Sequence, residues 1–181
     1  LATLRFDDCR LPAGNLLGDI NSGFKLAMRT LDIFRASVAA AAIGMGRRAL
    51  HDAVNYSRER PMFGAHLADL PLTQARLGDM ASLLDAAALL TYRAAWLRDT
   101  QGSDGDAAVA YTRAAAMAKL TATENASRVI DMALQMHGGT GVLVGNKLES
   151  LYRDIRSLRI YDGASEVQQL IIGKSVIKNP A

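Results

Sequence analysis

Hydrophobic residues recur every three or four positions along most of this chain, with polar residues between them. This spacing places the apolar side chains on one face of an α-helix. It predicts helices from Asn21 or Ser22 to Phe34, and then over residues 35–60, 70–101, 107–137, 147–156 and 165–174. Three long helices with short connections favour an all-α fold, an antiparallel up-down helical bundle. Because many of the apolar positions are alanine, we expect the helices to approach one another closely.

Residues that stop or cap helices support these boundaries. Pro61 ends the second predicted helix. The stretch QGSDGD makes a turn, after which Asp104 or Asp106 is a candidate helix cap. Ser165 and Gln168 have the S-x-x-Q spacing of a capping box, which predicts the start of the last helix.

Residues 1–18 follow a different pattern. The segment begins with a strand-like run, followed by a turn that contains proline and glycine. We expect these residues to be the last strand of a preceding domain and a linker, and residues 19–181 to form the helical domain. Because the chain lacks an initiator methionine, we also expect it to be a piece of a longer protein.

The composition argues against several classes of function. The net charge is +3, but basic and acidic residues are interspersed, which argues against a nucleic-acid surface. Cys9 is the only cysteine and the three histidines have no metal-ligand spacing, so neither an internal disulfide nor a metal site is expected. The longest apolar run, residues 38–45, is too short to span a bilayer, and the N-terminal residues have no signal-peptide layout.

Two motifs near helix ends each have two interpretations. RERPMFG, residues 58–64, is either a helix end stabilised by cations or an anion site, because the guanidinium group of arginine matches phosphate oxygens. QMHGGTG, residues 135–141, is either a helix stop or a place where backbone N–H groups approach a ligand closely. It follows a helix and lacks GxxxxGK[ST], so neither a P-loop nor a Rossmann site is supported.

Asp162, in the stretch RIYDGASEVQQLII, also has two interpretations. It is either a solvated residue near the positive end of the last helix or a base that abstracts a proton. Its immediate neighbours leave both possibilities open.

The order of these motifs resembles the C-terminal domain of flavin-dependent acyl-CoA dehydrogenases. That order is RxxFG, a glutamine on the next helix, QxHGGxG, LYRD and IYxGxSxxQxLIIG, and the resemblance covers essentially the whole chain. It implies an oxidoreductase of fatty acid metabolism with FAD, an acyl-CoA substrate, an unidentified electron acceptor and a homodimeric or homotetrameric state. It places the enzyme in the cytoplasm, or in the mitochondrial matrix of a eukaryote. It also implies that residues 1–18 are the tail of the family's β-barrel domain.

The resemblance implies roles for individual residues. The positions that match the family's contacts to FAD, some of them across a subunit interface, are Arg60, Phe63, Gln74, Gln135, Gly138 and Gly139. The positions that match substrate contacts are Asp32 and Arg35 beside the CoA, and Tyr161 in the acyl cavity. Asp162 falls where many members have the glutamate that abstracts the α-proton.

Three positions depart from the family pattern. Met62 and Ala164 each stand where a threonine is common, and each loses a hydroxyl donor worth about 1 kcal/mol. The third departure is the aspartate base, whose side chain is shorter than that of glutamate by about 1.5 Å. Some members instead have the glutamate one residue before Arg35, but here that residue is Phe34, which cannot accept a proton. If Asp162 packs against the flavin and the acyl chain, loss of water should raise the pKa of its carboxyl.

Two other functions stay open at this point. A flavoenzyme of the same superfamily with a non-CoA substrate is one, because nitroalkane oxidases use an aspartate base. A non-catalytic bundle for assembly is the other. Asp32 and Arg35 favour a CoA substrate, and the joint presence of RxxFG and QMHGG argues against a purely structural bundle. We expect residues 1–181 alone to bind FAD weakly and to be inactive.

Overall fold

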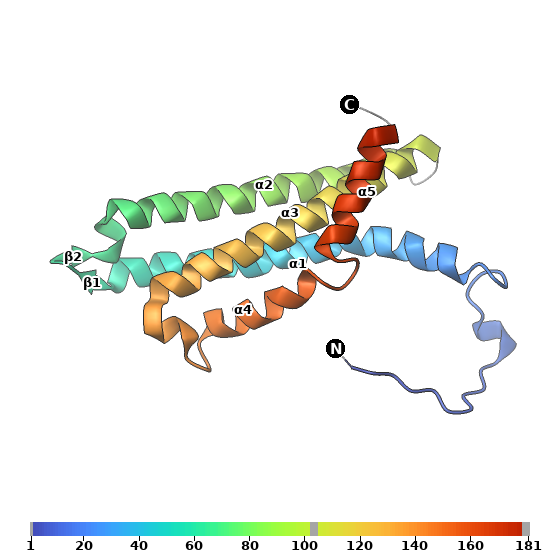
Figure 1. Ribbon diagram of the computed structural model, residues 1–181, viewed down its shortest axis with the longest axis horizontal. Helices are drawn as coiled ribbons and strands as arrows, with labels where there is room; N and C mark the ends of the chain where they lie inside the picture. The colour runs from blue at the N-terminus through green and yellow to red at the C-terminus, as the bar shows by residue number, and fades with distance from the viewer. Residues whose placement is uncertain (1, 102–104, 179–181) are drawn as a thin grey trace.

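The structure is a computed structural model that describes residues 2–101 and 105–178 (Figure 1). Its helices, 3-10 turns (η) and strands are η1 (Ala13–Asn15), α1 (Gly23–Glu59), β1 (Pro61–Met62), β2 (Ala65–His66), η2 (Leu67–Asp69), α2 (Pro71–Gln101), α3 (Gly105–His137), η3 (Gly138–Val142), α4 (Lys147–Leu158) and α5 (Ser165–Lys178). The three long helices lie side by side and alternate in direction (Figure 1). The predicted antiparallel all-α bundle is therefore confirmed.

The central helix of the bundle is α3, which packs against α1, α2, α4 and α5 (Figure 1). Alanines with no exposed surface line these contacts: Ala39, Ala42, Ala49, Ala53, Ala87, Ala94, Ala115, Ala118, Ala122, Ala126 and Ala133. At Gly46 on α1, a Cβ atom would lie 2.5 Å from the Cδ2 of Leu84 on α2. The predicted close approach of the helices is thus confirmed, and it depends on small side chains.

The prediction of two helices over residues 21–60 is wrong, because a single helix, α1, runs from Gly23 to Glu59. No proline or glycine lies between Phe24 and Ile43, so nothing in that stretch interrupts the helical hydrogen bonds. Asp32 and Arg35 form a salt bridge across the predicted boundary, since residues three apart share a helix face. Ser22 is the N-cap residue, although its side chain makes no capping hydrogen bond.

The connections between helices differ in detail from the prediction. Asp106 lies in the first turn of α3, whereas Asp104 lies outside the described residues. After α1 the chain forms a hairpin of two-residue strands, β1 and β2, that the sequence pattern did not predict. Phe63 and Gly64 form its turn with φ angles of 53° and 80°, as a tight hairpin requires at both central positions.

The N-terminal segment forms no strand in the described range 2–22. It contains the short turn η1, and residues 2–21 are all exposed. A strand-like sequence becomes a strand only when its backbone groups pair with a neighbour, and no such pairing occurs here. Its assignment to a preceding domain stays a prediction.

Candidate active site

Asp162 lies in the turn between α4 and α5 and has an unusual backbone conformation. Its φ is 56°, in the left-handed region that residues other than glycine rarely adopt, and Gly163 follows with a φ of 87°. A Cβ atom on Gly163 would lie 2.5 Å from the Nε2 of Gln168. The turn therefore requires glycine at 163, both for its φ angle and for space.

Two buried side chains hold the carbonyl groups of this turn. The Nζ of Lys119, on α3, donates a 2.8 Å hydrogen bond to the carbonyl of Gly163. The Nε2 of Gln168, on α5, donates to the same carbonyl at 2.9 Å and to that of Asp162 at 3.3 Å. Neither Lys119 nor Gln168 has any exposed surface. The turn is thus fixed from α3 and from α5 together.

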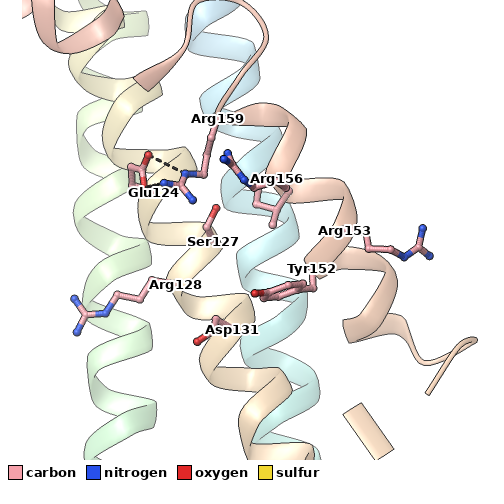
Figure 2. A pocket seen from close by; sticks show the side chains of 9 residues that line it. Glu124, Ser127, Arg128, Asp131, Tyr152, Arg153, Arg156 and Arg159 are labelled. Atoms are coloured by element: carbon pink, nitrogen blue, oxygen red, sulfur yellow. Dashed lines mark hydrogen bonds and ion pairs between the residues drawn. The ribbon is translucent and has the colours of Figure 1, made fainter. Parts of the chain in front are cut away.

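Glu124, also on α3, forms a second anchor beneath the turn. One carboxylate oxygen accepts hydrogen bonds from the Nε of Arg159 at 2.8 Å and from the Oγ of Ser165 at 2.5 Å. Arg159 and Glu124, joined by this ion pair, also line a groove of about 590 Å³ between α3 and α4 (Figure 2). These contacts fix both ends of the segment that contains Asp162.

The predicted capping box of Ser165 and Gln168 is wrong. The Ser165 hydroxyl donates to Glu124, and the backbone N–H of Ser165 donates to the carbonyl of Arg159. The Oε1 of Gln168, which a capping box would use, has no partner among the described residues. Contacts with α3 and with Arg159 have thus replaced the local contacts that the capping box predicted for the start of α5.

The Asp162 carboxyl is half-buried, and its Oδ2 atom is buried without a hydrogen-bond partner among the described residues. Burial raises the pKa of this carboxyl, while the positive charges of Arg35 and Lys119 lower it. The net effect is a raised pKa, in the direction expected for a proton-abstracting base in a site shielded from water.

Arg35 belongs to a polar cluster on α1 and α3. Arg35 is buried and pairs with Asp32, whose Oδ2 accepts a 2.9 Å hydrogen bond from Thr112. The hydroxyl of Tyr111 donates to the backbone carbonyl of Asp32, also at 2.9 Å. Both Asp32 and Arg35 influence the pKa of Asp162, so the fold brings these three predicted site residues together.

Tyr161 precedes Asp162 and is 37% exposed. Burial and the neighbouring negative charge of Asp162 both raise the pKa of its phenol. The side chain is therefore a neutral, partly accessible aromatic group at ordinary pH, next to the candidate base.

The predicted FAD-binding residues lie elsewhere, at the end of the bundle where α1 and α3 finish (Figure 1). Stacking of the Tyr56 and His137 rings, with centroids 4.1 Å apart, joins the two helix ends. The predicted residues at this end are all exposed: Arg60, Phe63, Gln74, Gln135, Gly138 and Gly139. We call these six residues the far-end cluster.

The far-end cluster has the chemistry expected for a ligand that carries phosphate and an aromatic ring. Arg60 forms no ion pair within the described residues, and Phe63 is 89% exposed. Gly138 has a φ of 58°, and no atom lies within 4 Å of a Cβ built on it or on Gly139, so a ligand can approach this backbone closely. Gln74 is partly engaged, because its Nε2 donates to the carbonyl of Ala68 at 3.1 Å. The residues present therefore fit the diphosphate and adenosine portions of FAD.

One copy of the chain keeps the two groups of residues apart. Lys119, which contacts the Asp162 turn, and His137, beside the far-end cluster, lie on the same helix. At 1.5 Å per residue, about 27 Å of helix separates them. The fold therefore places the predicted FAD-binding residues at one end of the bundle, far from the Asp162 turn.

Lys119 and Glu124 are the important site residues that the sequence patterns missed. Both lie in the alanine-rich stretch of α3, where the apolar repeat predicted only packing. Lys119 is fully buried between Ala115 and Ala122, at helical spacing from both. A charged residue inside an apolar stripe was the available sign that this position has a partner.

Comparison with known proteins gives consistent matches. A family model for the acyl-CoA dehydrogenase C-terminal domain matches residues 21–177. The short-chain specific acyl-CoA dehydrogenase of human mitochondria is 42% identical over 178 residues, which cover 98% of this chain and 42% of that protein. The caffeyl-CoA reductase-Etf complex subunit CarC of Acetobacterium woodii is 40% identical, over 95% of this chain and 44% of that protein. The structure of butyryl-CoA dehydrogenase from Megasphaera elsdenii superposes with a TM-score of 0.87 at 38% identity, covering 95% of this chain and 43% of that one. This chain thus spans less than half the length of these relatives.

Proposed function

The chain belongs to the acyl-CoA dehydrogenase family, and from this premise we propose that it is part of an enzyme that dehydrogenates an acyl-CoA thioester between its α and β carbons. The main observation in support is the Asp162 carboxyl, half-buried with an unpartnered oxygen, in a turn held by two neighbouring helices. A bundle with a purely structural role has no use for such a group, because a buried polar atom without a partner lowers stability.

In the proposed reaction Asp162 takes the α-proton of the thioester. That proton is weakly acidic, so its removal needs a well-placed carboxylate and stabilisation of the enolate oxygen that develops. The backbone N–H of Asp162 is a candidate donor to that oxygen. Burial of the carboxyl raises its pKa and so makes it a stronger base once it is deprotonated.

The substrate side of the proposed site consists of Tyr161, Asp32 and Arg35. Tyr161 is partly exposed beside the base and would line the acyl cavity. Arg35 is buried, so its contribution is the positive charge that favours the carboxylate form of Asp162. Asp32 and its hydrogen bonds to α3 hold Arg35 in place beside the CoA site.

We propose FAD as the cofactor, with the far-end cluster of one copy binding the diphosphate and adenosine of an FAD whose substrate is processed by another copy. When bound, the flavin would accept the hydride from the β-carbon. This arrangement accounts for the separation of about 27 Å between the cluster and the Asp162 turn, and it requires a homodimer or homotetramer. The remaining flavin contacts would come from preceding domains, of which residues 1–18 are the proposed tail.

The relatives support the electron acceptor and the location that we propose. One relative is named as a subunit of an Etf complex, so an electron carrier of that type is the acceptor we propose to test first. Another is mitochondrial, which suggests the matrix if the source is a eukaryote and the cytoplasm otherwise. None of the helices within residues 2–101 and 105–178 contains an apolar stretch that could span a membrane.

The test is the rate of flavin reduction by a panel of acyl-CoAs in the flavin-loaded enzyme. Asp162→Asn keeps the size of the side chain but cannot accept the proton, so reduction should slow by at least about 100-fold while FAD content is unchanged. Asp162→Glu serves as the matched variant that keeps a carboxylate, and it should stay active. Near-parental reduction in the Asn variant would show that Asp162 is not the base. Reduction by nitroalkanes but by no acyl-CoA would instead identify a non-CoA flavoenzyme with an aspartate base.

A further inference from the structure

Lys119 is a fully buried lysine in the alanine-rich stretch of α3. Its relative exposure is 0%, and the neighbouring positions on its face of α3 include Ala115 and Ala122. Placing an ammonium group in such surroundings is costly unless hydrogen bonds and an opposite charge compensate for the loss of water. The compensation here comes from the Asp162 turn, through the 2.8 Å hydrogen bond to the carbonyl of Gly163.

The turn itself needs outside support. A left-handed φ at a residue other than glycine, such as Asp162, is unfavourable and persists only where the surroundings enforce it. Support comes from the hydrogen bonds that Lys119 and Gln168 donate to the carbonyls of Asp162 and Gly163. Gln168 lies on α5, which begins just after the turn, so its hydrogen bonds are local. Lys119 lies on α3, so its hydrogen bond ties the turn to the central helix of the bundle.

We propose that Lys119 is a positioning residue for Asp162, which holds the Gly163 carbonyl and thereby keeps the Asp162 carboxyl in its reactive place. This inference rests on the proposed function for its consequence, because only a catalytic Asp162 makes the position of the turn matter for turnover. Lys119 is fully buried and bonds to the Gly163 carbonyl, so its effect is transmitted through the turn.

Several charged groups act on this pair and set the direction of any pH effect. Asp32 and Arg35 face it from α1, Glu124 from α3 and Glu166 from α5. The positive charges of Arg35 and Lys119 lower the pKa of Asp162, against the effect of burial. Removing the lysine charge should therefore raise the pKa of Asp162 further, leaving Arg35 to favour the carboxylate.

The test uses the chain itself with ¹³C-labelled aspartate carboxyls. Lys119→Met keeps a long side chain but removes both the donor and the charge. NMR titration should show a higher pKa for Asp162, and the backbone N–H of Ser165 should exchange at least about 10-fold faster, since a hydrogen bond to a charged group contributes 1.5–3 kcal/mol. An unchanged pKa together with unchanged exchange would overturn the proposal.

Thr123→Val is the matched control. Thr123 is also fully buried, one turn further along α3, but its hydroxyl bonds within the helix, to the carbonyl of Lys119 at 2.9 Å. This variant should leave the pKa of Asp162 and the exchange of Ser165 as in the parent. If it changes both as strongly as Lys119→Met does, general loosening of the core explains the effect and the positioning role is wrong.

If Lys119→Met does not fold, the parent chain provides a second measurement. The ¹⁵Nζ resonance of Lys119 should shift in a step at the pH where Asp162 titrates. Absence of that step would overturn the proposal.

Catalysis separates this inference from the proposed function. In the flavin-loaded enzyme, Lys119→Met should slow flavin reduction about 10-fold and shift the pH profile of that rate to higher pH. When Asp162→Asn is already present, adding Lys119→Met should not slow flavin reduction further. A fully active Asp162→Asn variant would overturn the catalytic assignment alone, whereas an inactive Asp162→Asn variant beside an unaffected Lys119→Met variant would overturn only the positioning role.

Discussion

The Asp162 turn and the far-end cluster contain similar residue types in opposite surroundings. At the turn, the basic side chains of Lys119 and Arg159 are tied to a backbone carbonyl and to a carboxylate of the chain itself. At the far end, Arg60 is exposed with no ion pair in the described residues, and Phe63 is almost fully accessible. The difference indicates that the turn is organised from within the chain, whereas the far-end cluster has groups left over for a ligand or another copy.

This contrast leads to different expected effects of mutation. Changes at the turn should alter both the stability of the chain and the placement of the base, because the same bonds serve both. Changes in the far-end cluster should alter ligand affinity and leave stability nearly unchanged, because exposed groups without partners contribute little to folding.

The largest effect is expected for Gly163→Ala. The new Cβ would lie 2.5 Å from the Nε2 of Gln168, and the φ of 87° is unfavourable for alanine. Urea denaturation should show a loss of about 1–3 kcal/mol, and flavin reduction should slow on the order of 100-fold as the base is displaced. Gly173→Ala on α5 is the control, since nothing lies within 4 Å of its Cβ position. Equal behaviour of the two variants would contradict the special role of the turn.

The next effect in size is expected for Arg60→Ala. Loss of a charge-assisted hydrogen bond to the FAD diphosphate, worth about 1.5–3 kcal/mol, should weaken FAD binding by about 10- to 100-fold in the assembled enzyme. The urea midpoint of the chain should not change. Arg58→Ala, two residues earlier and also exposed, should retain FAD as the parent does. FAD titration by fluorescence measures both variants, and equal losses would rule out a specific contact by Arg60.

A smaller effect is expected for Glu124→Gln. The substitution weakens the bonds from Arg159 and Ser165 but leaves Lys119 in place, and the ion pair is partly exposed. The free energy of unfolding should fall by about 1 kcal/mol. Glu149→Gln removes a pair within α4 whose arginine, Arg153, is 65% exposed, and it should cost less because that pair joins no distant segments. A larger loss for Glu149→Gln would show that the Glu124 anchor is not specific to the turn.

The smallest effect is a gain in stability from Asp162→Asn. The pKa of Asp162 is raised in the folded chain, so the folded state favours the protonated form. Its stabilising contribution is present below the ordinary pKa of 3.8 and is lost as the pH rises through the raised value. At pH 7 the Asn variant should therefore unfold at a temperature higher by on the order of 1 °C, and the difference should vanish at pH 3. A lower melting temperature at pH 7 would mean that the carboxylate is well solvated or paired.

Much of the fold was predictable because helix periodicity is a local property. The predicted limits of α2 and α3 agree with the structure within a few residues, since three- and four-residue spacing, prolines and glycines act over one or two turns. The motif order also identified Asp162 and the far-end cluster as candidates. The boundary predicted within α1 was wrong, because no proline or glycine separates the two helical stretches.

The surroundings of Asp162 depended on contacts that the sequence pattern does not contain. Lys119, Glu124 and their partners in the turn are 35 to 44 residues apart, and the capping box failed because Ser165 bonds to α3 and not to its own helix. Packing of α3 against α5 also decided which polar groups lost water, and hence that the pKa of Asp162 is raised. The sequence by itself determined which residues form helices and which motifs stand at their ends. Only the tertiary structure decided which of those ends meet, because desolvation and hydrogen bonding between distant segments exist only once the helices have packed.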